Sequence, residues 1–295
     1  MSGARFSILD LVDLGLLTAA KRGRQKLAGD TEEFYETFFT DLDESVMASG
    51  EDLRKETRLS GLAGAVAKHA PAGRVLDVGC GVGDTLAALA QLPNAELYGI
   101  EYSAATLTRA RRLVGHRADL RQGSATALPY EREFFDCLTC SEVLEHLPDD
   151  QAALAECFRV LRPGGVLVLT VPYRHWFPAY EPLMGHFRHY DRESLDRSLS
   201  AAGFRTIEWL PNYPRWHRAA DYSYALCRIA AMVSSRLGAP ALPHELRLPG
   251  GSSPLLKQLS ALWEPLRSQD ARLVYSQLPT STWVVAQRPA PPSAS

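Results

Sequence analysis

Short apolar runs alternate with amphipathic segments over residues 73–172. The runs are rich in Val, Leu, Ile and aromatic residues and are bounded by Gly, Pro or polar residues, which is typical of buried strands. Continuous apolar strands that alternate with helices indicate a parallel sheet covered by helices on both faces. Strands are predicted at 74–79, 95–102, 120–125, 135–142 and 165–172, and helices at 84–92, 103–114 and 149–161, with a turn at RPGG, residues 162–165.

Three further elements extend this pattern toward the C-terminus. A helix is predicted at 191–203, where Asp191 opens the helix and Gly203 stands in the C-terminal stop position. Strands are predicted at 204–210 and 278–289. We therefore expect the α/β class, with a Rossmann-like, doubly wound sheet of seven strands.

The other segments are predicted to be mainly helical additions. Residues 30–42 and 58–70 show helical spacing of apolar side chains, and residues 221–237 form an amphipathic stretch. We divide the chain into an N-terminal helical extension (1–70), a core (71–212), a helical insert or lid (213–272), the final strand of the core (273–290) and a disordered tail (291–295).

Composition and charge narrow the class of protein. Of the 295 residues, 46% are hydrophobic and 22% are charged, which is ordinary for a globular protein. The formal net charge of -2 lacks the basic excess of most nucleic-acid-binding proteins, so no nucleic-acid partner is expected. No apolar run approaches the roughly 20 residues that span a bilayer, and no secretory signal is evident, so we expect a soluble, cytoplasmic protein.

The five cysteines form no recognisable metal or disulfide pattern. Cys137 and Cys140 have CxxC spacing, but they lie inside a predicted strand and no second pair completes a zinc site. Buried free thiols in a reducing compartment are the expectation.

A glycine-rich turn follows the first predicted strand, with glycines at 79, 81 and 83. Glycine lets backbone approach a ligand without a Cβ in the way, and the following helix points its free N–H groups at the turn. Asp77 interrupts the apolar strand just before the turn, where a carboxylate is costly to bury without a partner. The partner is either the amides of the turn itself or an ammonium group on a ligand.

A second acid makes this turn a candidate nucleotide site. Glu101 ends the next strand, 18 positions after Gly83, and an acid at about that separation can accept hydrogen bonds from both ribose hydroxyls of an adenosine. Polar residues also follow the third and fourth strands. They are expected at the carboxyl edge of the sheet, where open α/β sheets bind ligands.

Five segments together carry a family resemblance. VLDVGCGVGDTL, the acid in YGIEYS, GSATALPY, FDCLTCSEVLEHLPD and RVLRPGGVLVLTVP resemble, in order, the motifs of class I S-adenosylmethionine-dependent methyltransferases. Within that class they resemble the UbiE/UbiG-like small-molecule branch, over about residues 72–210. A dinucleotide dehydrogenase is the alternative, but there the third glycine normally follows the second by three residues instead of two, and the strand lacks an acid like Asp77.

The resemblance implies S-adenosylmethionine as the cofactor and assigns residues to it. Asp77 and the backbone of residues 79–83 would hold the methionine end, Glu101 would hold the ribose, and Tyr102 would pack near the adenine. Ser124 stands where the family usually has an acid that accepts from the adenine amino group. The predicted cofactor residues are Asp77, Gly79, Cys80, Gly81, Gly83, Glu101, Tyr102, Ser124, Ala125 and Ser141.

Four residues are predicted to act on the acceptor. Methyl transfer is a direct displacement that mainly needs alignment, and a hydroxyl acceptor also needs a base, for which histidine suits neutral pH. His146 follows the fourth strand and His186 follows the fifth, so both face the same edge. Arg188 and Tyr190 complete a segment, GHFRHY, that resembles a GHxRxY element of some members of the branch. The alternative is that this segment only packs the loop and caps the next helix.

No metal site is predicted. His175, His186 and His189 could group together, but no acidic residue stands at a persuasive spacing. His189 alternates with Arg188 and is expected to point away.

The acceptor is less well defined. We expect a small-molecule, sugar or lipid-linked acceptor and favour O-methylation, with N- or C-methylation as the close alternative. A non-catalytic cofactor-binding module is favoured by Ser124 alone, and an RNA methyltransferase would need salt-sensitive RNA binding. Residues 219–237 are expected to cover the site as a lid; the alternative is peripheral membrane contact. The oligomeric state stays open.

Overall fold

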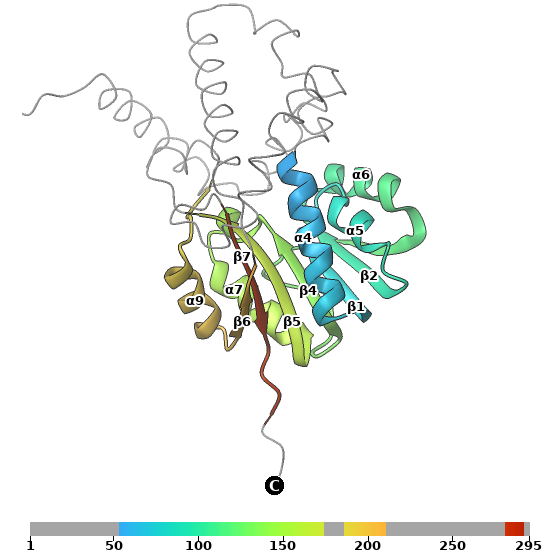
Figure 1. The fold of residues 1–295 in the computed structure, drawn as a ribbon. Helices are drawn as coiled ribbons and strands as arrows, with labels where there is room; N and C mark the ends of the chain where they lie inside the picture. The colour runs from blue at the N-terminus through green and yellow to red at the C-terminus, as the bar shows by residue number, and fades with distance from the viewer. Residues whose placement is uncertain (1–52, 174–185, 211–280, 292–295) are drawn as a thin grey trace, which may run out of the picture.

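A seven-stranded sheet forms the centre of the molecule (Figure 1). The structure, a computed structural model, describes residues 53–173, 186–210 and 281–291. The strand order is β3-β2-β1-β4-β5-β7-β6, and β7 runs antiparallel to both of its neighbours. The strands are β1 Ala72–Val78, β2 Asn94–Glu101, β3 Ala118–Gln122, β4 Phe135–Ser141, β5 Leu161–Pro172, β6 Arg205–Trp209 and β7 Ser281–Gln287. The predicted seven-stranded, doubly wound α/β class is confirmed.

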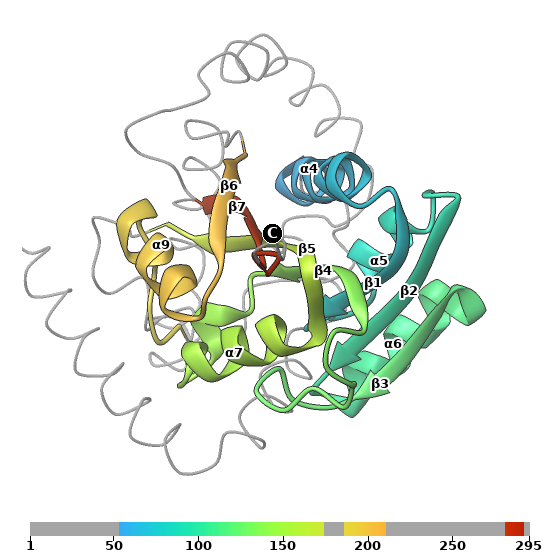
Figure 2. The same cartoon turned by 90° about the horizontal axis from the view of Figure 1, so that it is seen from below.

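Helices cover both faces of the sheet (Figure 2). One face carries α4, α5 and α6, and the other carries α7 and α9. The helices are α4 Leu53–His69, α5 Asp84–Leu89, α6 Ala104–Val114, α7 Asp150–Val160 and α9 Arg192–Ala201, with short 3-10 turns η1 Gly115–Arg117 and η2 Leu144–His146. None of the helices in these described ranges is long and apolar enough to cross a membrane.

Two apolar clusters lie on the two faces because successive strand residues point in opposite directions. Leu76 and Leu138 pack under α7 and α9, whereas Val75 and Cys137 pack under α4 and α5. The four described cysteines, Cys80, Cys137, Cys140 and Cys157, are buried free thiols, as predicted.

Helix α4 packs directly on the sheet. Leu62 and Val66 are fully buried in the cluster that contains Val75. A Cβ added at Gly61 would lie 2.4 Å from Trp283 Cζ3, so the helix approaches β7 too closely for a larger residue. This packing assigns α4 to the same core as β1. The extension before it, the insert at 213–272 and residues 292–295 lie outside the described residues, so those boundaries stay predictions.

The predicted turn at 162–165 is replaced by the start of β5, which begins at Leu161. Gly164 N donates to Arg288 O (2.8 Å) and Arg288 N donates to Gly165 O (2.9 Å). These bonds pair the segment with residues that follow β7. A partner so distant in the chain leaves no local signal, so the sequence RPGG by itself indicates a turn.

Candidate functional site

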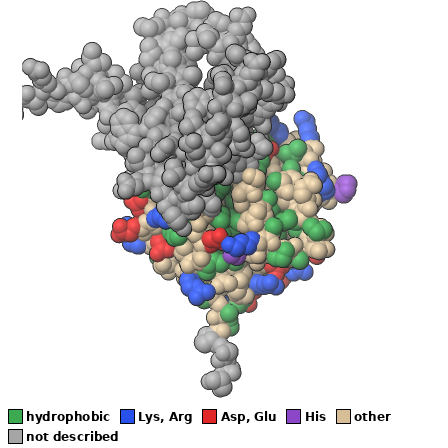
Figure 3. Space-filling model, in the orientation of Figure 1, with side chains coloured by type: hydrophobic (Ala, Val, Ile, Leu, Met, Phe, Trp, Pro, Cys, Tyr) green, Lys and Arg blue, Asp and Glu red, His purple; other side chains and the backbone are tan. Residues whose placement is uncertain are grey.

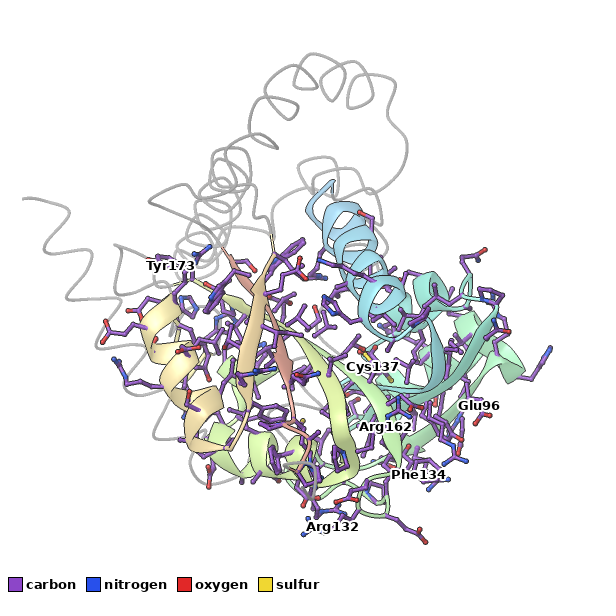
Figure 4. The ribbon with its side chains drawn as sticks, turned by 60° about the horizontal axis from the view of Figure 1, so that its bottom comes forward. Glu96, Arg132, Phe134, Cys137, Arg162 and Tyr173 are labelled. Carbon is purple, nitrogen blue, oxygen red and sulfur yellow. The ribbon has the colours of Figure 1, made fainter. Side chains whose placement is uncertain are left out.

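The loop after β1 lies at the carboxyl edge of the sheet. Figure 4 shows this edge near Tyr173, which follows β5, while Phe134 and Arg162 mark the opposite end. Gly79 has φ 69°, and a Cβ there would lie 2.6 Å from Val143 Cγ2 of the loop after β4. Gly81 has φ 53°, yet a Cβ there would meet nothing within 4 Å. The loop is therefore packed at Gly79 and open at Gly81, as a backbone cradle for a ligand requires.

Asp77 is buried at the end of β1, with 2% of its surface exposed. Thr139, its register neighbour on β4, donates a hydrogen bond to Asp77 Oδ1 over 2.6 Å. Burial away from water raises the pKa of Asp77 to about 7. The structure therefore pairs Asp77 with a side chain of β4 in place of the predicted amides of the turn. A cationic ligand group would relieve the cost of this buried acid.

Glu101 joins the ends of β1 and β2. Its Oε2 accepts from Gly81 N and its Oε1 accepts from Ser103 N, both over 2.9 Å. The carboxylate is thus held at the rim of the glycine loop. Tyr102, the next residue, is partly exposed at 37% and holds Gln122 Nε2 through its carbonyl oxygen.

The other predicted cofactor residues lie near the same edge. Ser124 Oγ bonds Thr126 Oγ1 (2.8 Å), and Ser141 Oγ bonds Thr170 Oγ1 (2.9 Å). Cys80 is buried, which raises the pKa of its thiol, and its amide donates to Ile100 O. Ala125 is part of the core.

A second group of polar side chains gathers after β4. The His146 and His186 rings meet edge to face with centroids 4.6 Å apart, which brings together two of the predicted catalytic residues. His186 Nδ1 lies 2.6 Å from His189 Nε2, so His189 points toward His186 and not away from it as we expected. A backbone hydrogen bond from Phe187 N to Glu145 O (2.7 Å) holds the segment after β4 next to the segment after β5, which brings the histidine rings together.

Arg188 and Tyr190 contact the neighbouring loop. Arg188 donates to Leu147 O (2.8 Å) and Pro148 O (2.6 Å), and Tyr190 Oη donates to Asp150 Oδ2 (2.7 Å). Burial raises the pKa of Tyr190 well above its usual range. These contacts fit the alternative in which the segment packs the loop, and a catalytic role for the two residues stays a prediction.

Sequence reasoning missed two acids in the segment EVLEH. Glu145 is fully buried, and neither of its carboxylate oxygens has a hydrogen-bond partner among the described residues. Glu142 has φ 56°, a conformation that non-glycine residues seldom adopt, and its Oε1 is likewise buried without a partner there. Burial and then the charge of Glu142 raise the pKa of Glu145 well above its usual range. Two acids three positions apart beside a histidine were the available signal.

Arg58 of α4 was also missed. Its Nε is buried and has no hydrogen-bond partner within the described part of the chain. Its positive charge lowers the pKa of both Asp77 and Glu145, although burial outweighs this effect at each. A cation at this position became evident only once α4 was seen to pack on the sheet.

Several known proteins are similar to this chain. Residues 76–169 match a family described as a methyltransferase domain. A relative described as "Probable S-adenosylmethionine-dependent methyltransferase" from Mycolicibacterium smegmatis is 36% identical over 48% of this chain and 56% of its own length. A demethylmenaquinone methyltransferase from Roseiflexus castenholzii is 33% identical over 57% of this chain and 76% of its own length.

The chain therefore belongs to the class I S-adenosylmethionine-dependent methyltransferases. A solved structure of the [4+2]-cyclase SpnF has the same fold, with a TM-score of 0.54 and 25% identity over 78% of this chain and 80% of that one. The chain spans less than three-fifths of the length of the first curated relatives that it matches. The cofactor of the family is S-adenosylmethionine. The open backbone at Gly81 and the buried acids Asp77 and Glu101 suit its methionine and ribose ends.

Proposed function

We propose that the protein transfers a methyl group from S-adenosylmethionine to a hydroxyl group of a small-molecule acceptor. The observation that carries the proposal is the placement of two groups of residues at one sheet edge. Asp77 and Glu101 flank the open glycine loop, while His146 and His186 follow the neighbouring strands. The candidate cofactor site follows β1 and β2, and the two histidines that could accept a proton follow β4 and β5, which come next in the strand order.

The cofactor is proposed to lie across the ends of β1 and β2. The ammonium of its methionine end would pair with Asp77, and the guanidinium of Arg58 would pair with its carboxylate. Glu101 would accept from the ribose hydroxyls while it keeps its bonds to the loop amides, because each carboxylate oxygen can accept more than one hydrogen bond. Tyr102 would cover the adenine, and Ser124 would take the place of the usual acid.

The reaction is a displacement at the methyl carbon. A C–O bond forms as the S–C bond breaks, the sulfonium leaves as neutral S-adenosylhomocysteine, and the proton of the hydroxyl passes to a base. His146 and His186 are the candidates for that base. We favour O-methylation because a weakly acidic hydroxyl needs such a group, whereas an unprotonated amine does not. The demethylmenaquinone relative supports a small-molecule acceptor.

Cofactor binding without methyl transfer is the second candidate. Two observations favour it, namely Ser124 in place of an acid and the likeness to a cyclase. This alternative predicts binding of S-adenosylmethionine and no methylated product with any acceptor.

The first test is calorimetric titration of the full chain with S-adenosylmethionine, with NADH as the control ligand. We expect the first to bind and the second not to bind. Methyl transfer from labelled cofactor to phenols, sugars and quinols would then be measured. Cofactor binding with no labelled product across the panel would favour the second candidate, and no cofactor binding would contradict both.

His186→Ala separates acceptor chemistry from cofactor binding. We expect turnover to fall by about 100-fold or more, while the dissociation constant for S-adenosylmethionine changes less than about threefold. His116→Ala is the matched control, because His116 is exposed and lies at the opposite end of the sheet, just before β3. Turnover unchanged in His186→Ala would remove this residue from the mechanism.

A further inference from the structure

Glu145 raises a question that cofactor binding does not answer. Its side chain is fully buried, and both carboxylate oxygens lack a hydrogen-bond partner among the described residues. A buried carboxylate without a partner is one of the costliest arrangements in a protein interior, so such groups are normally paired or bound to a metal. Two imidazoles lie within 4.8 Å of this carboxylate.

Those imidazoles belong to His146 and His186. One ligand atom from each of the three residues lies within 4.8 Å of the other two. Ligand atoms around an ion at about 2.1 Å stand roughly 3 to 4 Å apart, so the three atoms would have to move together by at most about 1 to 2 Å to bind one ion. The two loops are already fixed together by the bond from Phe187 N to Glu145 O.

We propose that Glu145, His146 and His186 bind a divalent transition-metal ion. Two neutral imidazoles and one carboxylate favour Zn²⁺, Mn²⁺, Fe²⁺ or Co²⁺ over Mg²⁺ and Ca²⁺, which prefer sets made of oxygen alone. Three protein ligands leave positions open for other molecules, which is the arrangement of catalytic and not of structural metal centres.

The surroundings of the three ligands support the site. His186 Nδ1 and His189 Nε2 are hydrogen-bonded over 2.6 Å, and a proton on His186 Nδ1 would make Nε2 the atom of His186 that binds the ion. Glu142 adds negative charge beside Glu145 and holds a strained backbone, a feature that is concentrated at functional sites. The sequence predicted no metal because the acids and the second histidine are separated in the chain.

This metal would also define the acceptor, an extension that rests on the proposed function. An acceptor hydroxyl at an open metal position would lose its proton to water more easily, because the ion stabilises the oxyanion. That oxyanion would then attack the methyl carbon as the S–C bond breaks. The histidines would act as ligands instead of bases. With two open positions, an acceptor that carries a hydroxyl beside a second oxygen would be preferred.

The test is metal binding by the full chain after treatment with EDTA and desalting. We expect one equivalent of Mn²⁺ by electron paramagnetic resonance and a Co²⁺ visible spectrum typical of nitrogen and oxygen ligands. Glu145→Gln, His146→Asn and His186→Ala should each weaken binding by 100-fold or more, and His189→Ala by about 10- to 100-fold. His116→Ala should bind as the wild type does.

Calorimetric titration with S-adenosylmethionine shows whether each variant is still folded. Variants that keep cofactor binding and lose the metal support the site. No stoichiometric metal in the wild type, or unchanged binding in all three ligand variants, would overturn it. Full turnover of the EDTA-treated enzyme would overturn the metal's role while it leaves the proposed methyl transfer intact. Metal binding without any turnover would keep the site and remove the methyl transfer.

Discussion

At the scale of single residues, Asp77 shows how an unfavourable group marks a function. The strand buries its carboxylate, which accepts a hydrogen bond from the hydroxyl of Thr139. Burial raises its pKa to about 7. Between pH 4 and 7 the native protein therefore holds a proton that the unfolded chain has lost, so stability falls as pH rises through this window.

Asp77→Asn should remove this pH dependence. The asparagine oxygen can still accept from Thr139, but the side chain cannot ionise. We expect the ligand-free variant to gain stability over the wild type as pH rises from 5 to 8, by on the order of 3 kcal/mol over that range. The variant should also bind S-adenosylmethionine at least tenfold more weakly at pH 8. Urea unfolding at several pH values measures the first effect. A stability difference that does not vary with pH would show that Asp77 does not titrate there.

At the scale of elements, Arg288, which follows β7, contacts the C-terminal end of helix α7. Its guanidinium donates to Phe158 O (2.9 Å) and Leu161 O (2.7 Å) at the end of α7, and it bonds Glu133 Oε1 (2.6 Å). Arg288 is 8% exposed, so these carbonyl groups have little access to water as an alternative. The end of α7 is therefore capped by a residue about 130 positions later in the chain.

Arg288→Met should lower the free energy of unfolding by about 2 to 4 kcal/mol, because it leaves buried carbonyl oxygens and Glu133 without their donor. Arg197→Met is the control, since the Arg197 pair with Glu193 on α9 is exposed and should be worth less than about 1 kcal/mol. Urea unfolding of both variants gives the comparison. Equal losses would mean that burial of Arg288 adds nothing.

At the scale of the whole molecule, the strand order brings the candidate residues to one edge. β1 lies between β2 and β4, so the loops that carry Gly81, Glu101 and Glu145 are neighbours. The formal net charge of the whole chain is -2. Acidic and basic side chains of the described residues are mixed on the face that Figure 3 shows. On this face the described residues form no concentration of positive charge of the kind that a phosphate backbone needs.

Methyl transfer to a small acceptor should accordingly be insensitive to salt. We expect turnover to change less than about threefold between 50 and 200 mM KCl. A protein that makes six or more phosphate contacts would lose about 1,000-fold or more in affinity over that range. Two measurements at both salt concentrations distinguish a small-molecule acceptor from an RNA acceptor: the rate of methyl transfer and the affinity for transfer RNA. Tight RNA binding that weakens steeply with salt would favour an RNA acceptor.

The sequence alone was sufficient for the seven-stranded sheet and for the family, and it predicts the cofactor loop. Each of these features depends on a short stretch of sequence. The strand periodicity and the glycines at 79–83 each lie within one segment, and the acid at 101 lies at the end of the next strand. Only the tertiary structure decided how α4 packs, where Arg58 lies and that Glu145, His146 and His186 meet. These depend on burial and on contacts between loops some 40 residues apart, which chain folding creates and which no local pattern of residues records.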